Sequence, residues 1–175
     1  MKFRFILPAL LMIITFSACN LDNTSNTSPV LTLYSPRVNG DSIVKMYFTD
    51  ETQSAVRVDS LHVADTISML VVADARANSL TEFDIVPSDT SAIKVIIPDS
   101  IEDYIASGSI PKEGKYLMKP KTMLFYYPLT FIPQKPVEKL TINFKVTNDA
   151  VSVPNTSAFE FSFPIKPKRT KPSAQ

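Results

Sequence analysis

Glycine, cysteine, histidine and tryptophan are scarce in this sequence, and each shortage excludes a class of site. Among 175 residues there are 3 Gly, 1 Cys, 1 His and no Trp. Three glycines are too few for a glycine-rich phosphate loop, and one cysteine with one histidine cannot form a disulfide framework or a histidine metal cluster. The sequence therefore predicts neither a cofactor nor a metal site.

What the sequence does contain is typical of a folded domain built from strands. Hydrophobic residues make up 45% and charged residues 20% of the chain, which is inside the range of globular proteins and outside that of disordered ones. The 14 prolines favour turns and edge strands over long helices, because each removes a backbone donor and fixes one dihedral angle.

Residues 1–18 have the pattern of an export signal. Lys2 and Arg4 give a positive start, and Phe5 to Ala18 is a 14-residue stretch without a charge. A transmembrane helix needs roughly 20 apolar residues, so this stretch is too short to span a bilayer, and no later segment comes near that length. The stretch ends in Phe16-Ser17-Ala18-Cys19, with two small residues before the only cysteine.

This ending resembles the lipobox of bacterial lipoproteins. The resemblance implies cleavage just before Cys19, a diacylglyceryl group on its thiol and an acylated new amino end, which together hold a protein stably on a bilayer. Phe16 departs from the pattern, since Leu is favoured there. Asn20 stands where an Asp would keep a lipoprotein of enteric bacteria at the inner membrane, which favours the outer membrane of a Gram-negative cell. An ordinary cleaved signal and a short uncleaved anchor are the alternatives.

Composition separates both ends of the mature chain from a central domain. Residues 19–29 begin with the cysteine, lack enough apolar surface to pack, and are expected to form a polar tether. Residues 166–175 start with lysine and arginine alternating with proline, which indicates a basic disordered tail. The 136 residues between them, 30–165, are close to the commonest size of a single domain.

A period of two, which is typical of strands, dominates the central region. In Leu140–Thr147 every even position is apolar and every odd one polar, and Phe159–Ile165 repeats this pattern, so these two strands could pair through a loop at 148–158. Ile67–Val72 is apolar on both faces apart from Ser68, so it should lie centrally, beneath something. The remaining expected strands are Val30–Tyr34, Ile43–Thr49, Leu61–Val63, Phe83–Val86, Ile93–Ile97 and Met123–Tyr127.

These strands and one short helix define the expected fold. Pro128, Pro133 and Pro136 suit an edge strand or a strand that switches sheets, and the helix is expected from Ser100, as its cap, to Ser107. Eight or nine strands with such turns predict an all-β antiparallel sandwich with Greek-key connections. An immunoglobulin-like arrangement is preferred, with a jelly roll or a partly open barrel as alternatives.

Charge is distributed unevenly along the chain. Residues 20–103 hold 13 acidic and 5 basic residues, net −8, whereas residues 104–175 hold 4 acidic and 11 basic residues, net +7. Strands of the two halves should interleave and mix the signs; the alternative is a polar surface for a partner or for anionic lipopolysaccharide. The basic residues lie mainly in the tail without aromatic interleaving, so nucleic-acid binding is not expected.

Four groups of side chains are candidates for a chemical site. His62 falls on the polar phase of a strand and is expected to be a surface residue rather than a general base. The acidic pairs Asp50-Glu51 and Glu102-Asp103 could contribute to calcium binding. Structural roles are preferred. Asp50-Glu51 fits the end of a strand, where consecutive side chains point to opposite faces, and Glu102-Asp103 fits the start of a helix. Phe125-Tyr126-Tyr127 could stack on a sugar, yet packing in the sheet and core is preferred.

A tripeptide of Asp, Ser or Thr, and an aliphatic residue occurs four times, as Asp41-Ser42-Ile43, Asp59-Ser60-Leu61, Asp65-Thr66-Ile67 and Asp99-Ser100-Ile101. It resembles an O-glycosylation signal of exported proteins in some Gram-negative bacteria. The resemblance provides four candidate acceptors, Ser42, Ser60, Thr66 and Ser100. The alternative is that these tripeptides are turns that open a strand or helix.

The sequence predicts a function only in outline. We expect a lipid-anchored protein of the cell envelope that serves as a non-catalytic binding or structural accessory, with another envelope protein or a glycan as its partner. The alternative is a subunit of a surface appendage assembled by strand donation. An enzyme ranks third, and it would need a concave pocket that holds His62 or converging carboxylates.

Overall fold

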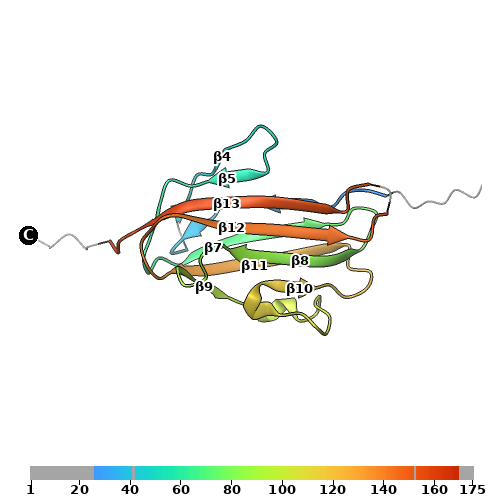
Figure 1. Cartoon of the computed structure of the whole chain (residues 1–175). Coiled ribbons are helices and arrows are strands. Elements are labelled where there is room, and N and C mark those ends of the chain that lie inside the picture. Colours follow the sequence, from blue (N-terminus) through green and yellow to red (C-terminus); the bar gives the residue numbers. More distant parts are fainter. Residues whose placement is uncertain (1–25, 41, 152, 170–175) are drawn as a thin grey trace, which may run out of the picture.

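The computed structural model describes residues 26–40, 42–151 and 153–169, and it is a two-layer β-sandwich (Figure 1). Sheet A has the order β3-β2-β7-β11-β9 with β1 beside β7, and sheet B has the order β10-β8-β12-β13-β5-β4 with β6 beside β13. The strands are β1 (Val30–Leu33), β2 (Arg37–Val38), β3 (Ser42–Ile43), β4 (Tyr47–Phe48), β5 (Ala55–Arg57), β6 (Leu61–His62), β7 (Ile67–Asp74), β8 (Leu80–Pro87), β9 (Ile93–Ile96), β10 (Lys115–Leu117), β11 (Leu124–Pro133), β12 (Val137–Asn148) and β13 (Thr156–Lys166).

The strand order is that of an immunoglobulin-like sandwich. β1 and β2 follow one another along the same edge of β7, and β5 and β6 do so along β13. If β1 and β2 are counted as one strand, and β5 and β6 as another, sheet A without its edge strand β3 has the A-B-E-D order, and the centre of sheet B has the C-F-G order. The all-β sandwich is therefore confirmed, as is the β12–β13 hairpin, while β5 and β6 correct the antiparallel prediction by running parallel to β13.

Two strand predictions were wrong in detail. Ile43–Thr49 is not one strand, because β3 lies in sheet A and β4 in sheet B, so the chain changes sheets between them. β11 is an interior strand that continues through Pro128. The carbonyl of Leu70, which lies opposite Pro128, accepts the Tyr34 N–H on its far side. The nitrogen of Pro128 therefore faces away from β7, along a stretch that β9 does not cover, and its missing N–H breaks no ladder bond.

The predicted helix over Ser100–Ser107 is reduced to a single 3₁₀ turn, η1 (Asp99–Ile101). Beyond this turn the backbone pairs with the β10 segment instead, through the Ile105–Met118 bridge and the Ala106 N–H bond to the Leu117 carbonyl at 2.7 Å, so the helix does not continue. A second 3₁₀ turn, η2 (Pro111–Glu113), was not predicted.

Aromatic rings fill the space between the sheets. Phe83 lies 5.3 Å from Phe125 and 5.7 Å from Tyr127 between ring centroids, and all three side chains are fully buried. Phe131 stacks on Phe163 at 5.5 Å. The predicted packing role thus holds for Phe125 and Tyr127, whereas the side chain between them, Tyr126, points outward and is 50% exposed.

The acidic and basic halves of the chain interleave, as expected for strands of one sandwich. Strands β7 and β8 of the acidic half pair with β11 and β12 of the basic half. On sheet B, Lys145 lies 3.1 Å from Asp84 and its pKa is raised, chiefly by that hydrogen bond. Lys135 lies 2.9 Å from Asp89, so the opposite signs pair across the two halves.

The ends of the domain extend beyond the expected limits. Thr27 and Pro29, placed in the tether by sequence, are partly or fully buried, and Lys166 closes β13 rather than opening a tail. Cys19, with the rest of residues 1–25, lies outside the described residues, as do residues 170–175. Within the described part of the chain no helix has the length and apolar character needed to cross a membrane.

Candidate binding cleft

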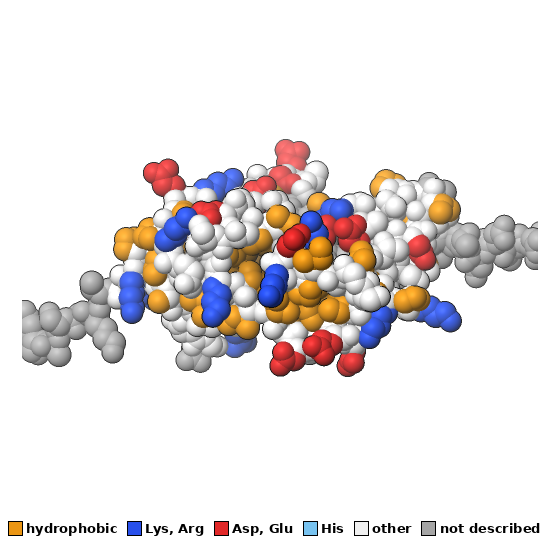
Figure 2. Space-filling model, turned by 60° about the horizontal axis from the view of Figure 1, so that its bottom comes forward, with side chains coloured by type: hydrophobic (Ala, Val, Ile, Leu, Met, Phe, Trp, Pro, Cys, Tyr) orange, Lys and Arg blue, Asp and Glu red, His pale blue; other side chains and the backbone are white. Residues whose placement is uncertain are grey.

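A cleft opens on one flank of the sandwich, between the β9 edge of sheet A and the β8–β10 edge of sheet B. It encloses about 690 Å³, part of which is open to solvent. Figure 2 looks onto this flank, where hydrophobic side chains gather between charged ones. The apolar lining of the cleft consists of Ile85, Pro87, Ile93, Val95, Ile97 and Tyr116.

Side chains on the inner face of β9 form one wall of the cleft. Ile93 and Val95 point inward, while Lys94 and Ile96 point to the outer face of sheet A. Ile93 is only 4% exposed at the bottom of the wall, and Ile97 is 38% exposed at its mouth. Because β9 is the last strand of sheet A, its outer backbone edge lies beside the cleft without a neighbouring described strand.

The opposite wall is the η2 turn, which ends at a glycine. Pro111 begins the turn, where its missing N–H costs no helical bond, and Gly114 ends it with a left-handed φ of 72°. The Gly114 carbonyl accepts the Ile85 N–H at 2.7 Å, and a Cβ on Gly114 would lie 1.9 Å from the Ile85 oxygen. Only glycine therefore allows this turn to close against β8. The η2 turn was not predicted, although Pro111 and Gly114 bracket it as start and stop signals.

A buried pair of phenols joins this cleft to the core. The hydroxyls of Tyr116 and Tyr127 lie 2.8 Å apart, and both side chains are at most 1% exposed. Burial raises the pKa of both phenols above the ordinary value of 10.0. Each hydroxyl is the other's partner, which satisfies two polar groups in an apolar layer.

Removing one hydroxyl of this pair should cost more than removing both. Tyr127→Phe leaves the Tyr116 hydroxyl buried and unpartnered, which we expect to lower the free energy of unfolding by about 1–2 kcal/mol. The double change Tyr116→Phe with Tyr127→Phe should restore most of that loss. Urea denaturation of the four chains measures this cycle, and equal losses for the single and double variants would contradict it.

The same pair predicts a loss of stability in alkali. A phenol whose pKa is raised by folding gives its full stabilisation below the unfolded value of 10.0, and this stabilisation is lost as the pH rises toward the folded value. We therefore expect the melting temperature of the wild type to fall above about pH 10 more steeply than that of the double Phe variant. If the melting temperatures of the two chains fall equally as the pH rises above about 10, this explanation is contradicted.

Titratable groups at the cleft mouth are few. Lys112 and Glu113 lie on η2 at the rim, and Glu113 is engaged by Lys115 at 3.0 Å. Glu113 is the one carboxylate among the residues that line the cleft.

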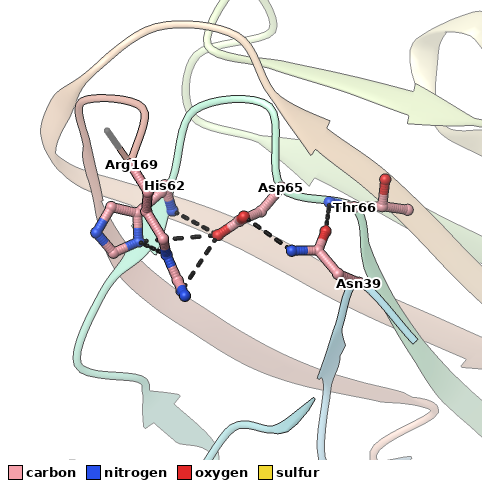
Figure 3. Close-up of polar contacts among 5 residues, drawn as sticks. All are labelled: Asn39, His62, Asp65, Thr66 and Arg169. Carbon is pink, nitrogen blue, oxygen red and sulfur yellow. Dashed lines mark hydrogen bonds and ion pairs between the residues drawn. The ribbon is translucent and has the colours of Figure 1, made fainter. Parts of the chain in front are cut away.

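His62 lies away from the cleft, in a polar cluster where three chain segments meet (Figure 3). Its Nδ1 accepts a hydrogen bond from Arg169 Nε at 3.2 Å, and Arg169 Nη2 lies 3.5 Å from Asp65 Oδ2. Asp65, which is 7% exposed, also accepts the His62 N–H at 3.2 Å and the Asn39 side-chain amide at 3.1 Å. Asn39 in turn accepts the Thr66 N–H at 2.9 Å.

This cluster changes two expectations. His62 is half-buried rather than an exposed surface residue, because Arg169 and Asp65 lie against it. Arg169, assigned to the tail, is part of the contact that joins the end of β13 to the β6–β7 turn. No sequence pattern could indicate this contact, since His62 and Arg169 are 107 residues apart.

Of the two acidic pairs, only Asp50 makes side-chain contacts that organise the surrounding described chain. The Asp50 carboxylate accepts bonds from the hydroxyls of Thr52 and Ser54 and from the Ala55 N–H, and the Ser54 bond is the main reason that its pKa falls to about 2. Glu102 and Asp103 are exposed beside η1. Among the described residues no three His, Cys, Asp or Glu side chains converge as metal ligands.

The candidate glycosylation residues lie at different depths. Thr66 and Ser100 are exposed, whereas Ser60 is half-buried. Ser42 lies in β3, and its side chain is outside the described part of the chain. The structure brings none of the described acceptors into the cleft, and their modification remains a prediction.

Comparisons with known proteins assign no family to this chain. No protein-family model and no curated protein matches the sequence. A family 123 glycoside hydrolase from Clostridium perfringens, described for glycolipid glycan hydrolysis, aligns over 79% of this chain with a TM-score of 0.40 and 14% identity; the alignment spans only 27% of the hydrolase. The Salmonella SafD adhesin aligns over 82% of this chain and 100% of its own, with a TM-score of 0.37 and 12% identity.

Proposed function

We propose that this protein is a lipid-anchored, non-catalytic binding or structural accessory of the cell envelope, carried on the outer membrane of a Gram-negative bacterium. The resemblance of Phe16-Ser17-Ala18-Cys19 to a lipobox supports the anchor at Cys19. The β-sandwich supports the binding role, since loops and sheet edges of this architecture commonly engage partners.

The cleft between β9 and η2 is the single observation that best supports a binding role. The cleft has an apolar lining, and the outer backbone edge of β9 lies at its rim without a strand partner in the described chain. An extended segment of another envelope protein could pair with β9 and place alternate side chains in the cleft. A glycan is the other candidate partner, and it would use the polar groups of Lys112, Glu113 and Thr90.

A non-catalytic role is supported by what lines the cleft. Its titratable side chains are Lys112, Glu113 and Tyr116, and Glu113 has Lys115 as a partner. His62 is not among the lining residues. General acid–base chemistry needs a positioned pair of groups within reach of one substrate, and this lining offers a single carboxylate.

The free edge of β9 also favours a second candidate, a subunit of a surface appendage. A strand donated by a neighbouring copy could extend sheet A at β9 and fill the cleft with its apolar side chains. Such a subunit would form heat-resistant oligomers as its concentration rises. A strictly monomeric domain over the same range would exclude this candidate.

Adjacent isoleucines offer a matched test of the cleft. Ile97 and Ile96 are 38% and 41% exposed, but only Ile97 lines the cleft. A photo-crosslinking residue at Ile97 of the full chain in its native cells should give a discrete adduct with one envelope component, and the same residue at Ile96 should not. Equal labelling from both positions, or labelling from neither, would contradict a partner in the cleft.

A further inference from the structure

The outer face of sheet A is apolar and open. The inward phase of β7 and β11 is buried in the core, and the outward phase is half-buried or exposed in the described structure. The expectation that Ile67–Val72 lies centrally is confirmed, but its outward side chains Leu70 and Val72 remain partly accessible. We define the apolar face by six residues: Tyr34, Leu70, Val72, Leu124, Tyr126 and Pro128.

Strand register places these side chains side by side. Val72 lies opposite Tyr126 and Leu70 lies opposite Pro128, while Leu124 lies at the end of the same row on β11. Tyr34 joins them because its N–H binds the Leu70 carbonyl at 3.0 Å. Tyr34 and Tyr126 are 54% and 50% exposed, so two large aromatic side chains are accessible on this face.

The two outer faces of the sandwich differ in charge. Sheet B carries Lys145 between Glu82 and Asp84, and Lys139 near Glu160 at 3.6 Å, as expected for a solvated face. Among the described residues, no charged side chain lies at the centre of the apolar face of sheet A. Arg37 and Lys94 lie outward at one end of sheet A, opposite the end that carries Asp74.

The N-terminal segment enters the domain beside this sheet. Asn148, which is 1% exposed, donates its side-chain amide to the Thr27 carbonyl at 2.7 Å, and the Asn26 side chain accepts the Val151 N–H at 3.2 Å. From here the chain runs directly into β1, an edge strand of sheet A. Seven residue steps separate Cys19 from Asn26 and reach at most about 25 Å, less than the roughly 40 Å length of the twelve-residue strand β12.

We propose that the apolar face of sheet A lies against the lipid surface of the membrane that carries the anchor. This inference rests on the proposed anchor at Cys19, because the short tether keeps the face within reach of the bilayer and gives a weak contact a high effective concentration. Tyrosine rings suit the boundary between head groups and acyl chains. Arg37 and Lys94 complement the phosphates of anionic lipids at the rim.

The absence of tryptophan makes a direct test possible, because one introduced Trp reports its own surroundings. Tyr126→Trp places the probe on the apolar face, and Val86→Trp places it on the outer face of sheet B, where Val86 is 43% exposed. The full chain, purified from its native membranes, is reconstituted in phosphatidylethanolamine and phosphatidylglycerol vesicles with brominated acyl chains. We expect several-fold stronger quenching at position 126 than at 86, as for a face buried at the head-group boundary.

Each outcome of this experiment decides a different claim. If the chain floats with the vesicles but both probes are quenched equally or not at all, the lipid contact is wrong and the anchor stands. If the chain does not float, the anchor is wrong and the inference fails with it. If emission from Tyr126→Trp shifts to the blue with protein concentration rather than with lipid, a second copy covers the face, which also overturns the proposal.

Discussion

Gly114→Ala should lower the free energy of unfolding by about 3–5 kcal/mol, because two costs combine at one position. A left-handed φ of 72° strains any residue with a Cβ, and here the Cβ would lie 1.9 Å from the backbone oxygen of Ile85. That oxygen belongs to a central part of β8 and cannot move like the end of a flexible side chain. Relief would require η2 to separate from β8, which would also open the cleft.

Gly40 provides a matched control for this prediction. It also has a left-handed φ, of 89°, but no non-adjacent atom of the described residues lies within 4 Å of the Cβ that alanine would add. Gly40→Ala should therefore cost only the conformational strain, about 1–2 kcal/mol. Guanidinium unfolding of the two variants measures the difference, and equal losses would show that the close approach to Ile85 has no energetic weight.

Phe83→Ala should have a comparable effect from a different cause. Phe83 is fully buried, and its ring lies within 6.1 Å of the rings of Tyr116, Phe125 and Tyr127. Removing it loses the transfer free energy of the ring and leaves a cavity, which together cost about 3–5 kcal/mol in buried sites. A domain of this size is stable by about 5–15 kcal/mol, so a substantial part of the margin would disappear.

Tyr126→Ala is the control for the aromatic layer. Tyr126 neighbours two buried rings in sequence but is 50% exposed, so its truncation should change stability by at most about 0.5–1 kcal/mol in the isolated domain. Thermal unfolding of both variants checks the pair. A loss at Tyr126 as large as that at Phe83 would mean that the outward phase of β11 is not an open surface.

The parts of the fold that could be predicted are those in which local alternation and long-range pairing agree. Leu140–Thr147 lies within β12 and Phe159–Ile165 within β13, and they form the expected hairpin, because one buried face fixes both phase and register. The short strands β5 and β10 have three residues each and too little alternation to be seen. The change of sheet between β3 and β4 depends on the pairing of β3 with β2 and of β4 with β5, which no local pattern encodes.

The candidate site was less predictable, because it is assembled from distant segments. Ile93–Ile97 was expected to be a strand, but the position of its inward side chains next to η2 depends on the pairing of β11 with β9 and of β10 with β8. The polar surroundings of His62 depend on Arg169 in the same way. The apolar outer side of Ile67–Val72 was visible in the sequence, which indicated a covering layer but could not say that the described chain leaves it open.

The intact mass of the protein purified from its native membranes tests the account most directly. We predict a mature chain that begins at Cys19, lacks residues 1–18, and carries the added mass of a diacylglyceryl group and an amino-terminal acyl chain. Cys19→Ser should abolish that added mass and release the protein from the membrane fraction. A mature wild-type chain with an unmodified Cys19, or one cut elsewhere, would contradict the anchor and the proposals that depend on it.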